Sequence, residues 1–180
     1  MKPLSPTYGD KYSPEGKDMF VSDNSELEKL KNLSGKKTVI IGIGNPMKGD
    51  DGAGPELIRK LGGKNLPSDK FVLLDVGEVP ENYLQKVVNE KPDTVLLVDI
   101  ADMKTTPGPI RVLEYDDIID NSLSTHNASL KLTMDYIKAE IDTKIYLVGI
   151  QPEKLGFGDP ISPAVTNSII KICQFLGSLY

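Results

Sequence analysis

The sequence predicts a three-layer α/β domain in which helices flank a twisted, mostly parallel central sheet of about five strands. Hydrophobic runs alternate with helical patterns along most of the chain. Most of these runs are apolar throughout, which is typical of parallel strands that are buried on both faces. The sequence contains no solenoid-type repeat and no low-complexity block, so a single layered domain is the simplest architecture.

Five segments have the composition of strands. The first of them, KTVIIGIG, is a continuous β-branched run that predicts a buried strand. The fourth, GPIRVLEY, is a candidate for a sheet edge. The predicted strands are 37–44, 70–77, 93–102, 108–115 and 144–152.

Helices are predicted from apolar periodicity and from signals at the helix ends. Ser25 and Glu28 form a possible capping box for a short first helix within 24–37, and Gly35 marks its end. Ser162 is the expected N-cap of the last helix, with Pro163 as its first residue. The other predicted helices are 54–63, 80–91 and 127–141, and the last one covers 162–179.

Length and composition limit the organisation of the chain. The 180 residues favour one domain, at 25–180, which is long enough to bury a sizeable core. Residues 1–24 are polar and lack a clear period, so we expect them to form an N-terminal extension. The single cysteine, Cys173, excludes an intrachain disulfide and fits a cytoplasmic location.

Charge and hydropathy disfavour two classes of partner. The formal net charge is −5 and no dense Lys/Arg block is present, so we expect no nucleic acid partner. No apolar run approaches the length of a membrane span, and the N-terminus lacks the apolar stretch of a signal peptide. We therefore expect no membrane partner either.

The stretch IIGIGNPMKGDDGAGP, residues 40–55, has two possible interpretations. A dinucleotide loop would need a glycine where Met47 stands, and Pro46 lacks the N–H that a phosphate would need. No P-loop motif is present, and Asp50 and Asp51 would repel a pyrophosphate. A helix cap would explain one aspartate but not a cluster whose glycines allow close approach of a partner. We therefore favour a carboxylate site.

Other polar residues are expected at the same edge, because ligands of open α/β sheets bind beyond the carboxyl ends of the strands. Asp75 and Asp99 each end a predicted strand, where either could be a turn residue or a site residue. His126, the only histidine, lies in the polar stretch 124–127, which suggests a polar pocket. Together, Asp51, Asp99 and His126 offer two carboxylates and one imidazole, a set that suits nickel, zinc or manganese.

These residues lie in motifs that resemble the hydrogenase maturation endopeptidases, the proteases that process the large subunit of nickel–iron hydrogenases. The similarity is greatest to the branch that serves energy-converting and formate-lyase-linked hydrogenases. The matching stretches, which follow the family's order between about residues 27 and 177, are GIGNPMKGDDGAGP, DVGEVPENY, LLVDIADM, GPIRV, STHNASL and LVGIQPEKLGFGDPISPAV. The resemblance implies a protease that removes the C-terminal extension of the large-subunit precursor after nickel has been inserted.

The resemblance also implies which residues contact the metal. They are Asp51 after the glycine loop, the strand-end Asp99, and His126. Some family members carry Glu where this chain has Asp51, so the metal distance or the use of a bridging water can differ here. The implied cofactor is nickel supplied by the bound precursor, with no nucleotide.

The mechanism predicted from these residues uses no serine or cysteine nucleophile, because Cys173 lies on the apolar face of the last predicted helix. We hypothesise that Asp51, Asp99 and His126 reach the nickel of the precursor, which polarises the scissile carbonyl or activates a water molecule. Asp51 or Asp99 then takes the proton from the water. In an alternative mechanism, nickel serves only for recognition and an aspartate acts alone as general base.

Two other functions stay open at this stage. A non-enzymatic nickel carrier or assembly chaperone would use the same three residues and would leave the precursor uncut. A general hydrolase such as an aminopeptidase would need more metal ligands than one histidine and a few aspartates. We expect the protein to act as a monomer on the hydrogenase large-subunit precursor.

Overall fold

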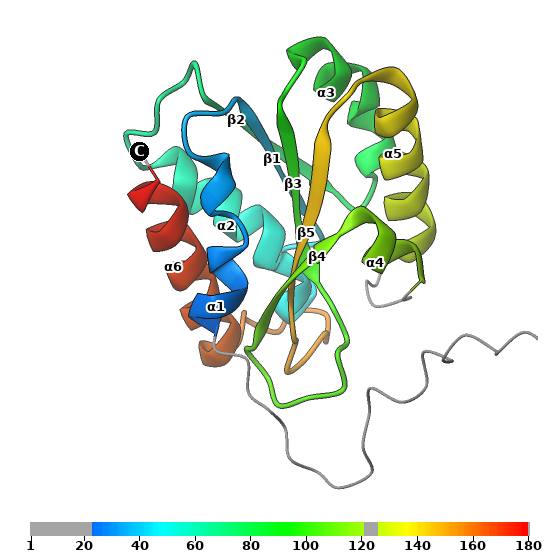
Figure 1. Ribbon diagram of the computed structural model, residues 1–180. Helices are drawn as coiled ribbons and strands as arrows, with labels where there is room; N and C mark the ends of the chain where they lie inside the picture. The colour runs from blue at the N-terminus through cyan, green and yellow to red at the C-terminus, as the bar shows by residue number, and fades with distance from the viewer. Residues whose placement is uncertain (1–22, 121–125, 180) are drawn as a thin grey trace, which may run out of the picture.

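The computed structural model describes residues 23–120 and 126–179. It contains a five-stranded sheet with helices on both faces (Figure 1). The strands are β1 (Thr38–Ile43), β2 (Phe71–Gly77), β3 (Thr94–Ile100), β4 (Ile110–Glu114) and β5 (Lys144–Ile150). The helices are α1 (Asp23–Glu28), α2 (Ala53–Gly62), α3 (Leu84–Glu90), α4 (Tyr115–Asp120), α5 (Asn127–Glu140) and α6 (Pro163–Ser178). The predicted α/β fold class is confirmed.

The order of the strands places the end of β1 beside the end of β3. The order is β2-β1-β3-β5-β4, with β4 antiparallel to β5 and the other pairs parallel. The predicted edge position of the segment 108–115 is therefore confirmed. Gly42 of β1 pairs with Val98 of β3, and β1 pairs with β2 on its other side. The strand order thus reverses between β1 and β3, where open α/β sheets bind their ligands.

The core forms two layers, one on each face of the sheet. Helices α1, α2 and α6 cover one face, and α3, α4 and α5 cover the other (Figure 1). Strand β3 contributes to both layers, because successive side chains point to opposite faces. Leu96 and Val98 pack in the first layer, whereas Val95 and Leu97 pack in the second. Burial on both faces explains why the strand is apolar throughout.

The first helix differs from its prediction. It begins at Asp23 and ends at Glu28, so Ser25 lies inside it and the predicted capping box is wrong. Asp23, which was predicted to lie in the extension, belongs to this helix. The physical reason is a tertiary contact, because Asp23 Oδ1 accepts the backbone N–H of Ile110 at 3.0 Å. The predicted extension otherwise lies outside the described residues.

The remaining strands and long helices follow the prediction, and the structure adds short helices. Residues 80–91 divide into a short 3₁₀ helix, η4 (Pro80–Tyr83), and α3, and the six-residue α4 was not expected. Ser162 caps α6 as predicted, since its side chain accepts the N–H of Val165 at 3.4 Å. Within the part of the chain that the structure describes, we find no helix with the length and hydropathy that a membrane crossing requires.

Candidate active site

Asp51 reaches the candidate site from a tight loop after β1. It lies in the 3₁₀ helix η3 (Gly49–Gly52), just before α2, and only 5% of its surface is exposed. The backbone N–H of Asn45 donates to Oδ2 of Asp51 at 2.9 Å. Gly44, with φ +130°, makes this fold of the loop possible, because a Cβ there would lie 1.8 Å from the carbonyl oxygen of Asp51.

Asp99 and His126 meet on the α5 side of the sheet. Asp99 continues the series Val95 and Leu97, which faces the core layer under α5. His126 directly precedes α5 and accepts, through its carbonyl oxygen, the N–H of Leu130 at 2.8 Å. The Nδ1 atom of His126 lies 3.2 Å from Oδ2 of Asp99. The strand therefore supplies the carboxylate and the start of the helix supplies the imidazole.

The three predicted site residues come together. Each of Asp51, Asp99 and His126 offers one potential ligand atom, and these atoms all lie within 4.8 Å of one another. Asp99 is fully buried, and the His126 side chain is 12% exposed. Two carboxylate oxygens and an imidazole nitrogen at this spacing suit a divalent transition metal, and they can equally hold and deprotonate a water molecule.

Burial and mutual charge shift the pKa values of the cluster. Burial raises the pKa of Asp51, and this effect outweighs the N–H of Asn45 and the charge of His126, which act in the opposite direction. The hydrogen bond to Asp99 raises the pKa of His126, with further support from the carboxylate charges of Asp51 and Glu78. The cluster thus favours a protonated imidazole beside two carboxyl groups and makes Asp51 a better proton acceptor.

Asp50, the neighbour of Asp51, has a different position. Its carboxylate is fully buried and accepts the backbone N–H groups of Glu153, Lys154 and Ser162 at 2.6–3.0 Å. The hydroxyl of Ser162 lies 3.1 Å from Oδ2 of Asp50. Asp50 therefore ties the segment after β5 to the glycine loop and does not belong to the cluster.

Sequence reasoning missed a polar link beside the cluster. The Nδ2 group of Asn45 donates to Oε2 of Glu78 at 3.0 Å, and Lys48 Nζ lies 2.6 Å from Oε1 of the same carboxylate. These contacts join the loop after β1 to the turn after β2, and they lower the pKa of Glu78. The dipeptide Asn45-Pro46 is a turn signal that pointed to this loop. Glu78 carried no comparable signal.

Two other residues considered from the sequence lie outside the cluster. Asp75 is exposed, and its Oδ1 accepts the N–H of Gly77 at 3.2 Å, which is the turn role that was left open for it. Cys173 is 3% exposed within α6, and burial raises its pKa to about 11. Such a thiol is a packing residue, as predicted. Of the polar stretch around His126, residues 124 and 125 lie outside the described residues.

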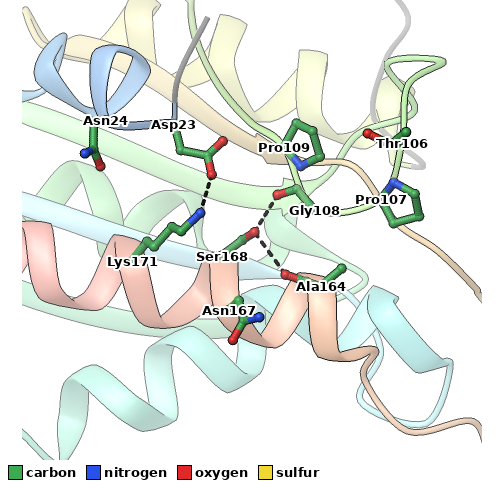
Figure 2. Close-up of a pocket in the computed structure, with 10 residues that line it drawn as sticks. All are labelled: Asp23, Asn24, Thr106, Pro107, Gly108, Pro109, Ala164, Asn167, Ser168 and Lys171. Carbon is green, nitrogen blue, oxygen red and sulfur yellow. Dashed lines mark hydrogen bonds and ion pairs between the residues drawn. The ribbon is translucent and has the colours of Figure 1, made fainter. Parts of the chain in front are cut away.

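A hollow of about 570 Å³ lies elsewhere on the surface, between α1, the segment before β4, and α6 (Figure 2). Lys171 of α6 forms an ion pair with Asp23 across it, with Nζ 2.7 Å from Oδ2. The hydroxyl of Ser168 donates to the carbonyl oxygen of Gly108 on its inner side. None of Asp51, Asp99 and His126 lines this hollow, so we treat it as separate from the candidate site.

The fold and the cluster together define a class of protein, an α/β protein with a site for metal binding or hydrolysis. An open α/β sheet carries two buried carboxyl groups and one imidazole at the point where its strand order reverses. Such a site can bind a divalent metal ion or activate water for hydrolysis.

The chain belongs to the hydrogenase maturation protease family. A sequence model of this family, HycI, matches residues 55–178, a segment that includes Asp99 and His126. The protein is therefore a peptidase, and the resemblance described from the motifs is confirmed.

Individual relatives agree with this assignment. The "Hydrogenase 3 maturation protease" of Escherichia coli K12 is 37% identical over 139 residues, which cover 77% of this chain and 87% of the relative. The crystal structure of a [NiFe] hydrogenase maturation protease HycI from Thermococcus kodakarensis KOD1 is similar with a TM-score of 0.75 and 28% identity, and the match covers 84% of this chain and 97% of that one. The solution structure of an endopeptidase HycI from Escherichia coli has a TM-score of 0.69 and 32% identity, with 79% and 90% covered.

Proposed function

We propose that this protein removes the C-terminal extension of the large-subunit precursor of a nickel–iron hydrogenase, once nickel has been inserted. The observation that carries the proposal is the cluster of Asp51, Asp99 and His126, whose ligand atoms lie within 4.8 Å of one another in a chain of this protease family. We expect it to act as a monomer in the cytoplasm, a location that its single cysteine fits.

In the proposed mechanism, Asp51 is the general base. Burial raises the pKa of its carboxyl group, which brings that group closer to the pH at which it can accept and return a proton. A water molecule between Asp51 and the scissile carbonyl gives its proton to the Asp51 carboxylate as its oxygen attacks the carbonyl carbon. The same proton then passes to the leaving amine when the peptide bond breaks.

His126 and Asp99 act as a pair. Asp99 is fully buried and holds the His126 ring through the contact between its Oδ2 and Nδ1. This contact supports a fixed orientation of the imidazole, and we propose its other ring nitrogen, Nε2, as the ligand or donor atom. The protonated ring also offsets one of the two carboxylate charges when no cation is bound.

Nickel enters this proposal as part of the substrate. The residues that would meet it are Asp51, Asp99 and His126, which offer the oxygen and nitrogen ligands that such a metal accepts. When bound there, the ion would supply Lewis acidity at the scissile carbonyl. A precursor without nickel would lack this contribution and part of the binding energy, so the protease would check for metal before it cuts.

The test is a comparison of two strand-end aspartates. Wild type, Asp99→Asn and Asp75→Asn proteins are each mixed with purified nickel-loaded precursor, and release of the C-terminal peptide is followed by mass spectrometry. We expect Asp99→Asn to process the precursor about 10² times more slowly or worse, because the pair with His126 is lost. Asp75→Asn is the control, since Asp75 is exposed and outside the cluster.

Two results would contradict the proposal in different ways. Equal processing by wild type and Asp99→Asn would show that the site is assigned wrongly. Stable binding of the precursor by wild type without any shortening would indicate a carrier or assembly chaperone that uses the same residues.

A further inference from the structure

Exposed apolar side chains concentrate at the edge of the sheet that holds the cluster. Among the described residues, six large hydrophobic side chains are well exposed, and four of them lie in loops that follow β1, β2 and β5. These four are Met47, Val79, Leu155 and Phe157, and the other two, Leu132 and Ile170, lie on α5 and α6. Apolar side chains gathered in this way mark surfaces that bind other molecules.

Three of them lie on two loops that are joined. The backbone N–H of Gly158 donates to the carbonyl oxygen of Met47 at 2.8 Å, which links the segment 153–162 to the loop after β1. The buried carboxylate of Asp50 holds both ends of that segment. Phe157 is nevertheless 74% exposed. The hydrogen bonds to Asp50 and Met47 hold the backbone of this segment in place. The aromatic ring of Phe157 therefore stays exposed to water, which is unfavourable for an apolar side chain.

Hydrogen bonds connect the backbone of Met47 to the cluster. Asn45 donates its backbone N–H to Asp51, and its Oδ1 accepts the N–H of Met47 at 2.9 Å. The next residue, Lys48, pairs with Glu78. The loop that positions Asp51 therefore carries both an exposed apolar side chain and an ion pair.

We propose that Met47, Leu155 and Phe157, here called the apolar rim, bind an apolar segment of the precursor beside the cleaved bond and thereby select which precursor is processed. This inference rests on the proposed function and specifies its substrate. Aromatic and methionine side chains are the residues that protein interfaces favour.

The charge of the surroundings favours a protein segment over a lipid surface. Asp51 and Asp99 lie at the same edge of the sheet as the rim, and negative groups repel the anionic headgroups to which exposed aromatic residues of peripheral proteins dock. An apolar peptide segment carries no such penalty. The rim is also small, which suits a few side chains of a bound segment.

The experiment separates binding from chemistry. Met47→Ala, Phe157→Ala and Phe157→Leu are compared with Leu132→Ala, a control in which the replaced side chain is as exposed as Met47, at 57%. Initial rates of peptide release are measured over a range of nickel-loaded precursor concentrations. We expect Phe157→Ala to raise KM about tenfold with little change in kcat, Met47→Ala to raise KM less, and Phe157→Leu to restore most of the loss. Thermal unfolding of all four variants should match wild type, because these side chains are exposed.

The outcomes distinguish failure of the rim from failure of the proposed function. If wild type cleaves the precursor and Phe157→Ala has the KM of Leu132→Ala, the rim does not bind substrate. Asn167→Ala, which alters the hollow of Figure 2, is measured as a fifth variant, and a KM increase confined to it would move the docking surface there and overturn the inference. If wild type binds the precursor without cleaving it, the proposed function fails, and the dissociation constants of the same variants still test the rim.

Discussion

Asp50 and Asp51 are neighbours in the chain but belong to different parts of the molecule. Asp50 points into the interior, where three backbone N–H groups of the segment after β5 converge on it. Asp51 points toward Asp99 and His126. The Asp50 carboxylate thus holds a loop in place, whereas the Asp51 carboxylate belongs to the candidate site. We therefore expect substitution of Asp50 to lower stability and substitution of Asp51 to lower activity.

Replacement of Asp50 should destabilise the protein. In Asp50→Ala, the buried N–H groups of Glu153, Lys154 and Ser162 lose their acceptor, and each such loss costs about 1–3 kcal/mol. We expect the free energy of unfolding, measured with urea, to fall by at least about 3 kcal/mol. A decrease below about 1 kcal/mol would contradict the anchoring role of this carboxylate.

Replacement of Asp51 should remove activity without loss of stability. Because burial raises the pKa of Asp51 above its usual 3.8, the folded state binds the proton more tightly than the unfolded state. The stabilisation from this group is therefore complete below about pH 3.8 and is lost as the pH rises through the folded-state pKa. We expect Asp51→Asn to unfold at the same or a higher temperature than wild type at pH 7, while precursor processing is lost. A lower Tm for Asp51→Asn than for wild type at pH 7 would contradict the expected direction of the effect of Asp51 on stability.

The sequence predicted that Asp51, Asp99 and His126 would lie together, but it did not predict the contacts that bury Asp50. Asp99 and His126 were found because a strand end and a helix start meet at the same edge of a parallel sheet. Asp50 and Asp51 share one glycine loop, and which of them points inward depends on a segment more than a hundred residues away. Local pattern contains no information about that contact.

At the scale of elements, the packing of α2 against β1 sets the position of Asp51. A Cβ on Gly54 would lie 2.3 Å from the carbonyl oxygen of Ile43, and one on Gly42 would lie 2.4 Å from that of Gly54. The start of the helix therefore touches the end of the strand with no room for a side chain. This close approach brings η3, and with it Asp51, over the end of the sheet.

A methyl group at this crossing should displace the helix start. We expect Gly54→Ala to lower the free energy of unfolding by about 1–3 kcal/mol and to reduce precursor processing, because backbone atoms must move to admit the new Cβ. Gly62→Ala is the matched control in the same helix. No atom lies within 4 Å of its added Cβ, so its stability should be unchanged or higher by up to about 1 kcal/mol. Equal unfolding free energies for the two variants would contradict the close-packing argument.

The elements themselves were largely predictable, and the exceptions have physical causes. Continuous apolar runs identified β1, β3 and β5 because these strands are buried on both faces. The edge strands β2 and β4 are partly exposed but still carry apolar residues. The start of α1 was misplaced because it depends on the contact between Asp23 and Ile110. Helix α4 has six residues, which is too short for a helical period to be recognised.

At the scale of the whole molecule, strand order decides where the chemistry occurs. The reversal between β1 and β3 brings together the two strand ends that carry Asp51 and Asp99, and α5 adds His126 from the helical layer. Alternation of strands and helices predicted the layers, whereas the order of strands depends on pairings between distant segments. The family resemblance, which the comparisons confirm, predicted that the protein is a protease. Hydrophobic periodicity alone could not predict this.

We propose that the cluster acts only when the docked precursor brings its own nickel. The most direct measurement is the mass of the purified large-subunit precursor after incubation with this protein, with the precursor prepared once with nickel and once without. We expect loss of the C-terminal peptide from the nickel-loaded precursor and an unchanged mass for the nickel-free one. Equal cleavage of both preparations would contradict the metal requirement and leave Asp51 as a base that acts without the ion.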